Sequence, residues 1–146
     1  VEGLLETIAE ASEQSDYVIV YIHWGTENEW EIDWAQKTYG PKIAEAGADF
    51  IIGSHAHILQ PIGYYGDTTL VYGLGNFWFN SKTMDSCLLK LTFPIEEEPY
   101  MELIPARQEN NKTVHLTGAD RTVWYDYMMS ISPEIQVDEN GRVFRK

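Results

Sequence analysis

The apolar residues of this chain gather in short continuous runs, and each run ends in a polar corner marked by glycine. Three such runs lie between residues 17 and 79 and end in the corners HWG, GSHAH and GNF. Continuous apolar runs of this length are typical of strands that are buried on both faces, as in a parallel or mixed sheet. We therefore predict strands at 17–22, 50–52 and 70–72, each presenting polar groups at its carboxyl end, where open α/β sheets keep their sites.

Helical periodicity appears on either side of the first two predicted strands. Residues 2–15 place their leucines and isoleucine on one stripe, which predicts an amphipathic helix. A second helix is predicted over 34–46, with a break or a new first turn at Pro41 because proline lacks the amide donor. The Gly66-Asp67 pair predicts a hairpin-like reversal before the strand at 70–72.

The pattern changes after Pro94, where short strands and turns replace the alternation of strand and helix. Pro105 is expected to restrict the strand at 100–104 to a sheet edge or a strand end. Asn140-Gly141 is typical of a tight hairpin. The elements predicted in this region are strands at 86–93 and 100–104, a helix at 119–131, and a hairpin of 135–137 with 143–144.

Three of the four histidines occupy the polar corners of the predicted strands. If the backbone stays extended from Ser54 onward, His55 and His57 point the same way, since side chains two apart share a face. His23 lies one strand–helix–strand unit earlier, so parallel strands would place it beside that pair. Neutral imidazole is the commonest protein metal ligand, and the three histidines therefore indicate a divalent metal site for Zn²⁺, Mn²⁺ or Fe. The alternative is that they are ordinary polar residues at strand ends, which is our interpretation of the isolated His115.

Composition and charge exclude several classes of protein. The chain has 146 residues and 44% hydrophobic residues, which favours one globular domain. The formal net charge of −13 opposes nucleic-acid binding, which needs a basic surface, and disfavours loose binding of a polyanion without a metal or a local basic patch. The longest apolar runs are too short for a membrane span. Cys87 is a single cysteine in an apolar run, so we expect a buried thiol and no internal disulfide.

Several motifs occur together in one order: HWGTE, AGADFIIGSHAHILQPI and YGLGNFWF. Over about residues 1–95 they resemble the second half of the poly-γ-glutamate capsule-biosynthesis protein family, which is similar to the calcineurin-like metallophosphoesterases. The resemblance implies that His23, His55 and His57 are ligands of a divalent metal such as Mn, Zn or Fe. It also implies that Glu27 and Asn76 contact substrate or support a ligand from outside the coordination sphere.

The chain also departs from the family pattern, because the Gly-Asp strand end and the Asn-Asn-His segment of the family's first half are missing. We therefore expect a fragment that holds half of a composite metal site, is inactive alone and binds at most one metal, weakly. Its expected partners are the missing N-terminal half, which would anchor it at the cell surface, and an anionic polymer or phosphoester held through the metal. An uncovered sheet edge would also allow a homodimer.

The resemblance implies an α/β fold, namely the C-terminal portion of a four-layer α/β/β/α sandwich with a mixed sheet. Residues 1–95 would form the metallophosphoesterase-like part, and residues 96–146 a hairpin and helix extension that completes the second sheet. The implied role is bacterial capsule biosynthesis. The alternatives are a metal-dependent phosphoester hydrolase in the intact protein, or a polymer-binding or assembly component without catalysis, and fold alone does not choose between them.

Overall fold

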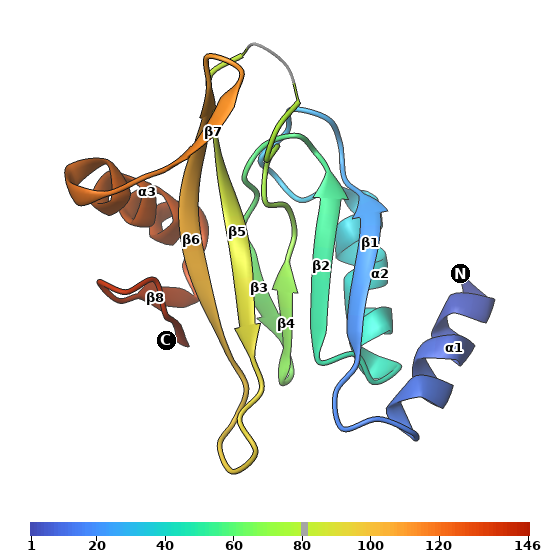
Figure 1. Ribbon diagram of the computed structural model, residues 1–146. Helices are drawn as coiled ribbons and strands as arrows, with labels where there is room; N and C mark the ends of the chain where they lie inside the picture. Colours follow the sequence, from blue (N-terminus) through green and yellow to red (C-terminus); the bar gives the residue numbers. More distant parts are fainter. Residues whose placement is uncertain (80–81) are drawn as a thin grey trace.

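The computed structural model describes residues 1–79 and 82–146, and these residues form three helices and nine strands (Figure 1). The helices are α1 (Glu2–Ser12), α2 (Trp34–Glu45) and α3 (Gly118–Ile131). The strands are β1 (Ile19–Trp24), β2 (Phe50–His55), β3 (Ile62–Tyr65), β4 (Thr68–Val71), β5 (Met84–Thr92), β6 (Tyr100–Glu109), β7 (Lys112–His115), β8 (Ile135–Val137) and β9 (Val143–Arg145).

The first sheet has four strands in the order β1-β2-β4-β3. β1, β2 and β4 are parallel, and β3 runs antiparallel to β4 across the predicted reversal at Gly66-Asp67. The crossover from β1 to β2 is made by α2, which confirms the strand–helix–strand unit predicted from the spacing of the histidines. All three parallel strands point the same way, so the loops that follow them meet at one end of the sheet (Figure 1).

The second sheet is antiparallel, in the order β5-β6-β7. β6 is its central strand and continues through Pro105, so the prediction that Pro105 restricts the strand to an edge or an end is wrong. Pro105 faces Cys87, whose N–H bonds to Leu74 outside the sheet, so no donor is required between these two residues. On its other side the Pro105 carbonyl accepts from Leu116, just beyond the end of β7.

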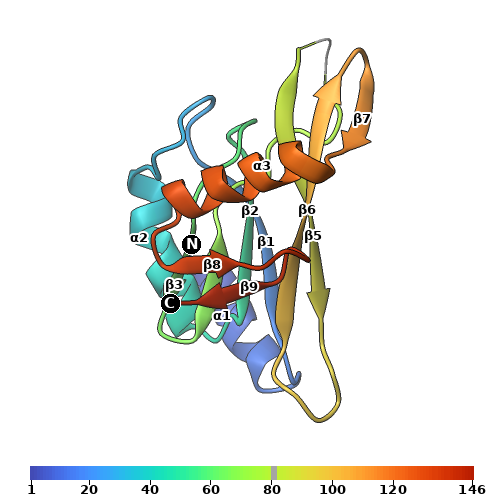
Figure 2. The ribbon, with the colours of Figure 1, turned by 90° about the vertical axis from the view of Figure 1, so that its left-hand side faces the viewer.

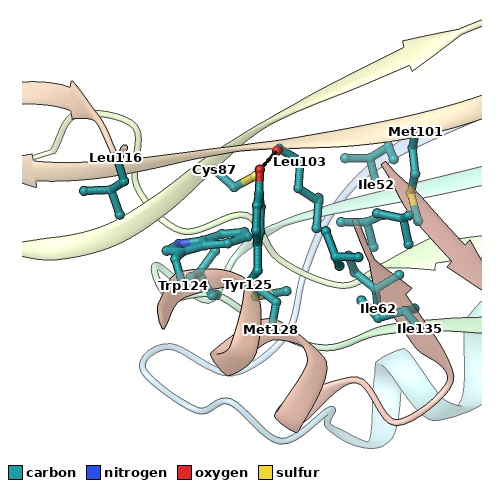
Figure 3. Close-up of a cluster of buried hydrophobic side chains, with 14 of the residues drawn as sticks. Ile52, Ile62, Cys87, Met101, Leu103, Leu116, Trp124, Tyr125, Met128 and Ile135 are labelled. Carbon is teal, nitrogen blue, oxygen red and sulfur yellow. Dashed lines mark hydrogen bonds between the residues drawn. The ribbon is translucent and has the colours of Figure 1, made fainter. Parts of the chain in front are cut away.

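The molecule is layered, with α1 and α2 on one face of the first sheet and the second sheet on the other (Figures 1 and 2). Alternate residues of the first sheet serve the two faces: Ile51 and Leu70 pack toward the helices, whereas Ile52 and Val71 pack toward the second sheet. Helix α3 and the β8–β9 hairpin close one side of the core between the sheets (Figure 2). Figure 3 shows Trp124 and other α3 side chains meeting residues of both sheets.

The mixed α/β class and the mixed sheet are confirmed, and the arrangement is consistent with part of a metallophosphoesterase-like sandwich. The predicted break at Pro41 is wrong, because α2 runs through this proline and ends at Glu45. The predicted boundary at residue 95 falls in the turn between β5 and β6, so residues on either side of it share one sheet. None of the described helices is both long enough and apolar enough to cross a membrane.

Candidate metal centre

The carboxyl ends of β1 and β2 bring the first two histidines together. The parallel register pairs His23 with Ser54 and Trp24 with His55, so the two histidines lie on adjacent strands one position apart. Their ring centroids are 4.5 Å apart. The Nδ1 atom of His23 lies 3.4 Å from the Ser54 hydroxyl.

His57 joins this pair through a turn and not through an extended strand. β2 ends at His55, and both His55 and His57 have positive φ angles, of 106° and 64°. The expected extended backbone from Ser54 to His57 is therefore wrong. The two rings nevertheless converge, with centroids 6.1 Å apart, because the left-handed backbone at both positions folds the chain back over the end of the strand.

A carboxylate reaches the same point from the loop that follows β1. The ligand atoms of Glu27, His55 and His57 all lie within 4.8 Å of one another. The Nε2 atom of His57 is 3.9 Å from the Glu27 carboxylate, whose side chain is 58% exposed and therefore free to adjust. The loop is fixed next to the histidine turn by its backbone, since Asn28 N–H donates to the Ala56 carbonyl at 2.8 Å.

Two fully buried glutamines, Gln36 and Gln60, hold the loop that carries Glu27 in place. Asp33 caps α2 in a capping box with Gln36: each backbone N–H bonds to the other residue's side chain at 2.9 Å. The Gln36 amide then donates to Gln60 at 2.8 Å, and the Gln60 amide donates to the Glu29 carbonyl at 2.9 Å. The network therefore joins the start of α2, the loop that carries Glu27 and the segment after His57.

Asn76 fixes the orientation and tautomer of His57. Its Oδ1 lies 2.8 Å from Nδ1 of His57. An amide oxygen only accepts, so His57 donates from Nδ1, and its Nε2 lone pair points to the side where Glu27 lies. Metal-binding histidines usually donate their second ring N–H in this way. Phe79 packs against the His57 ring, and the two ring centroids are 4.6 Å apart.

The donors fit a divalent cation. Two imidazoles and one carboxylate are a ligand set used by zinc enzymes, which leave a further position open. Ligand atoms around such an ion are about 3.4 Å apart when the bonds are about 2.1 Å, so the 3.9 Å between His57 and Glu27 needs only a small closure. A cavity of about 230 Å³ lies over the three histidines and Asn76, and it offers room for a ligand.

Residues 1–81 match the family model described as "Bacterial capsule synthesis protein PGA_cap", which covers more than half of the chain. The chain belongs to this family. It is 38% identical over 92 residues to the PGA biosynthesis protein CapA of Bacillus subtilis (strain 168), a match that spans 61% of this chain and 24% of the relative. It is 29% identical over 123 residues to the capsule biosynthesis protein CapA of Bacillus anthracis, spanning 80% of this chain and 30% of the relative. The chain therefore spans less than a third of the length of these two capsule proteins.

The structure brings four of the five residues predicted from the sequence of this PGA_cap family member to one point, and places His23, predicted as a ligand, beside His55 but outside the group of three converging ligand atoms. Glu27, His55 and His57 have their ligand atoms within 4.8 Å, Asn76 bonds to His57, and His23 stacks beside His55. Glu27, expected to touch substrate or support a ligand, is thus the carboxylate within ligand distance. Sequence reasoning missed the buried Gln36–Gln60 pair, although the D-W-A-Q pattern at 33–36 is a readable capping box.

Proposed function

We propose that the chain binds one divalent cation through Glu27, His55 and His57, and that the cation serves to hold an anionic group in capsule synthesis. The proximity of their three ligand atoms, all within 4.8 Å of one another, supports this most directly. The acidic chain, with a net charge of −13, repels a polyanion at long range, and a cation at this point offsets that repulsion locally. By family, the anionic ligand is poly-γ-glutamate or a phosphoester.

The chain's own residues have distinct tasks at this site. A divalent cation, when bound, supplies Lewis-acid polarisation of a phosphoryl or carboxyl oxygen. With the Nδ1 proton of His57 donated to Asn76, the Nε2 lone pair of the neutral ring is available as a ligand. Glu27 balances part of the cation's charge from an exposed loop position. His23, beside His55 and close to Ser54, borders the same cavity and is placed to contact the bound anion.

We propose two alternative classes of function for the intact protein, and the metal centre takes part in both. In the first, the whole protein is a metal-dependent phosphoester hydrolase with a metallophosphoesterase-like fold and a second cation held by residues outside this chain. In the second, the site binds the polymer at the cell surface without catalysis. In either class the isolated chain, with ligands for one cation, binds metal but does not hydrolyse.

Calorimetric titration with Mn²⁺ and Zn²⁺ tests the proposal directly. We expect one cation per chain, with binding lost in the His55→Ala/His57→Ala variant and weakened in Glu27→Gln. His115→Ala is the matched control, because His115 is an exposed histidine on β7, and it should bind as the unchanged chain does. Equal affinity of the double variant and the unchanged chain would refute the metal centre.

A phosphatase assay with Mn²⁺ separates the two classes. We expect the isolated chain to give no more hydrolysis of a model phosphoester than buffer does. Activity that follows the chain through purification and disappears in His57→Ala would show that one cation is enough, and would decide for the hydrolase.

A further inference from the structure

A further cavity lies beside the metal centre and not in it. It has a volume of about 380 Å³ and lies between the loop after His57 and the β5–β6 pair. We call it the Arg107 hollow; its walls include Ile58, Leu59, Met84, Asp85, Arg107 and Tyr127. Met84, Asp85 and Arg107 lie outside the sequence motifs quoted above.

The Arg107 hollow adjoins two cavities that border the metal centre. Ile58, the residue after His57, borders both this hollow and the cavity over the histidines. Met84 borders both this hollow and a smaller cavity of about 200 Å³ that contains Glu27, His57 and Lys82. Only the side chains of Ile58 and Met84 are shared between the hollow and the two cavities that His57 lines.

The hollow holds one cation, Arg107, which is paired with Asp85 and also lies near Asp120 and Glu109. The sequence has 10 lysines and arginines against 23 acids, yet Arg107 and Lys82 both border this group of cavities. The Arg107 side chain is 30% exposed, and its Nε donates to Asp85 at 2.6 Å. A guanidinium has five N–H donors in a planar fork, and this contact uses one of them.

We propose that the Arg107 hollow is a subsite for one carboxylate-bearing unit of an acidic peptide whose neighbouring unit lies at His57. The Arg107 guanidinium would bind the carboxylate, and the apolar side chains of Ile58, Leu59 and Met84 would contact the methylenes. Asp85 offers an acceptor for an amide N–H and disfavours a dianion beside it. The inference rests on the proposed function only in placing the other end of the ligand at the metal centre.

The test uses γ-linked tri-glutamate and the full chain with saturating Mn²⁺, and measures binding by calorimetry. We expect Arg107→Gln to weaken binding by about tenfold or more, the scale of a charge-assisted hydrogen bond, and Arg107→Lys to weaken it less. Amidating the peptide's α-carboxylates should weaken binding to the unchanged chain and make the Arg107→Gln substitution nearly silent. Arg145→Gln is the matched control, because Arg145 bonds to Gly66 at a distant turn.

A second variant guards against a folding defect, since Arg107 also pairs with Asp85. Met84→Glu adds a negative charge to the wall of the hollow and should weaken peptide binding while leaving both members of that ion pair unchanged in sequence. Folded Arg107→Gln and Met84→Glu chains that bind tri-glutamate as tightly as the unchanged chain would overturn the subsite.

The outcomes also separate the subsite from the metal centre. Loss of tri-glutamate binding in Arg107→Gln, measured in EDTA as well as in Mn²⁺, supports the subsite even if the unchanged chain fails to bind Mn²⁺. The opposite outcome is that the unchanged chain binds Mn²⁺, but the affinity for tri-glutamate depends neither on Arg107 nor on the peptide's α-carboxylates. That outcome would support the metal centre and refute the subsite.

Discussion

Replacing Gln60 by leucine is the most informative single change, because this residue links the fold to the candidate metal centre. Gln60 is fully buried, accepts from the Gln36 amide at 2.8 Å and donates to the Glu29 carbonyl at 2.9 Å. Leucine has nearly the same volume and keeps neither bond. The Gln36 amide is then left buried without a partner, and the carbonyl of the exposed Glu29 loses the bond that holds it.

The expected loss follows from those two groups. Each buried polar group that loses its partner costs about 1–3 kcal/mol, and the apolar surface that leucine buries offsets part of this. We expect the free energy of unfolding to fall by about 1–3 kcal/mol, which is a large share of the stability of a small domain. Gln36→Leu should cost a similar amount, and the double variant should cost less than the sum by about 1–2 kcal/mol, because one mutual bond is counted twice.

Urea unfolding followed by circular dichroism measures these values, with the slope against urea checked for constancy. Gln136→Leu is the control, an exposed glutamine of β8 that should change stability by less than about 0.5 kcal/mol. Mn²⁺ affinity should also fall in Gln60→Leu, because Glu29 is held two residues from the proposed ligand Glu27. A stability change as small as that of the control would refute the buried network, and a large change with unaltered Mn²⁺ affinity would refute its role in positioning Glu27.

Three further changes test other parts of the structure. Gly53→Ala should unfold the chain at lower urea and abolish Mn²⁺ binding, because a Cβ there would overlap the Tyr72 carbonyl; soluble, metal-binding G53A would contradict this. Burial raises the pKa of the Cys87 thiol to about 12, so stability should be complete below pH 9 and fall as the unfolded thiol ionises, by about 1.4 kcal/mol per pH unit up to pH 12. Alkaline unfolding curves of Cys87→Ala should lack that component, and equal slopes would exclude it. The predicted homodimer should depend on the edge strand β1, so Ile19→Lys, at a 49% exposed position, should shift light-scattering mass toward the monomer, and an unchanged mass would exclude this edge.

The fold could be predicted where local pattern and tertiary context agree. The apolar runs ending at His23 and His55 gave the parallel strands, and the Asn140-Gly141 turn joins β8 to β9 as expected. Strand β7 was missed because residues 112–115 are short and polar, and only pairing with β6 makes them a strand. Pro105 was misjudged because the sequence does not show how far the neighbouring strand extends. The pairing of β6 with β7 covers Ala106 to Glu109, so Pro105 has no paired residue in β7 that would need its missing N–H.

The sequence predicted which residues belong to the candidate site, but not the geometry in which they meet. Spacing placed His23 and His55 on neighbouring strand ends, which depends only on the topology. The left-handed backbone at His55 and His57 could not be read from the sequence, since neither residue is glycine and such conformations persist only when the surrounding structure imposes them. The Arg107 hollow depends on a contact between the second sheet and the loop after β2, and no local pattern reports a contact of that kind.

The position of Glu27 changes what this chain is expected to do alone. Three histidines offer neutral donors only and leave the full charge of a divalent cation unbalanced, which was the reason to expect weak binding. A carboxylate within 4.8 Å of His55 and His57 supplies one negative charge and completes a set of three protein ligands with an open position. The proposed centre therefore needs no residue from outside the chain to hold one cation, whereas a two-cation centre would need them. Metal binding and hydrolysis thus become separable properties of this chain, so Mn²⁺ binding without phosphatase activity is a positive result for the proposed centre.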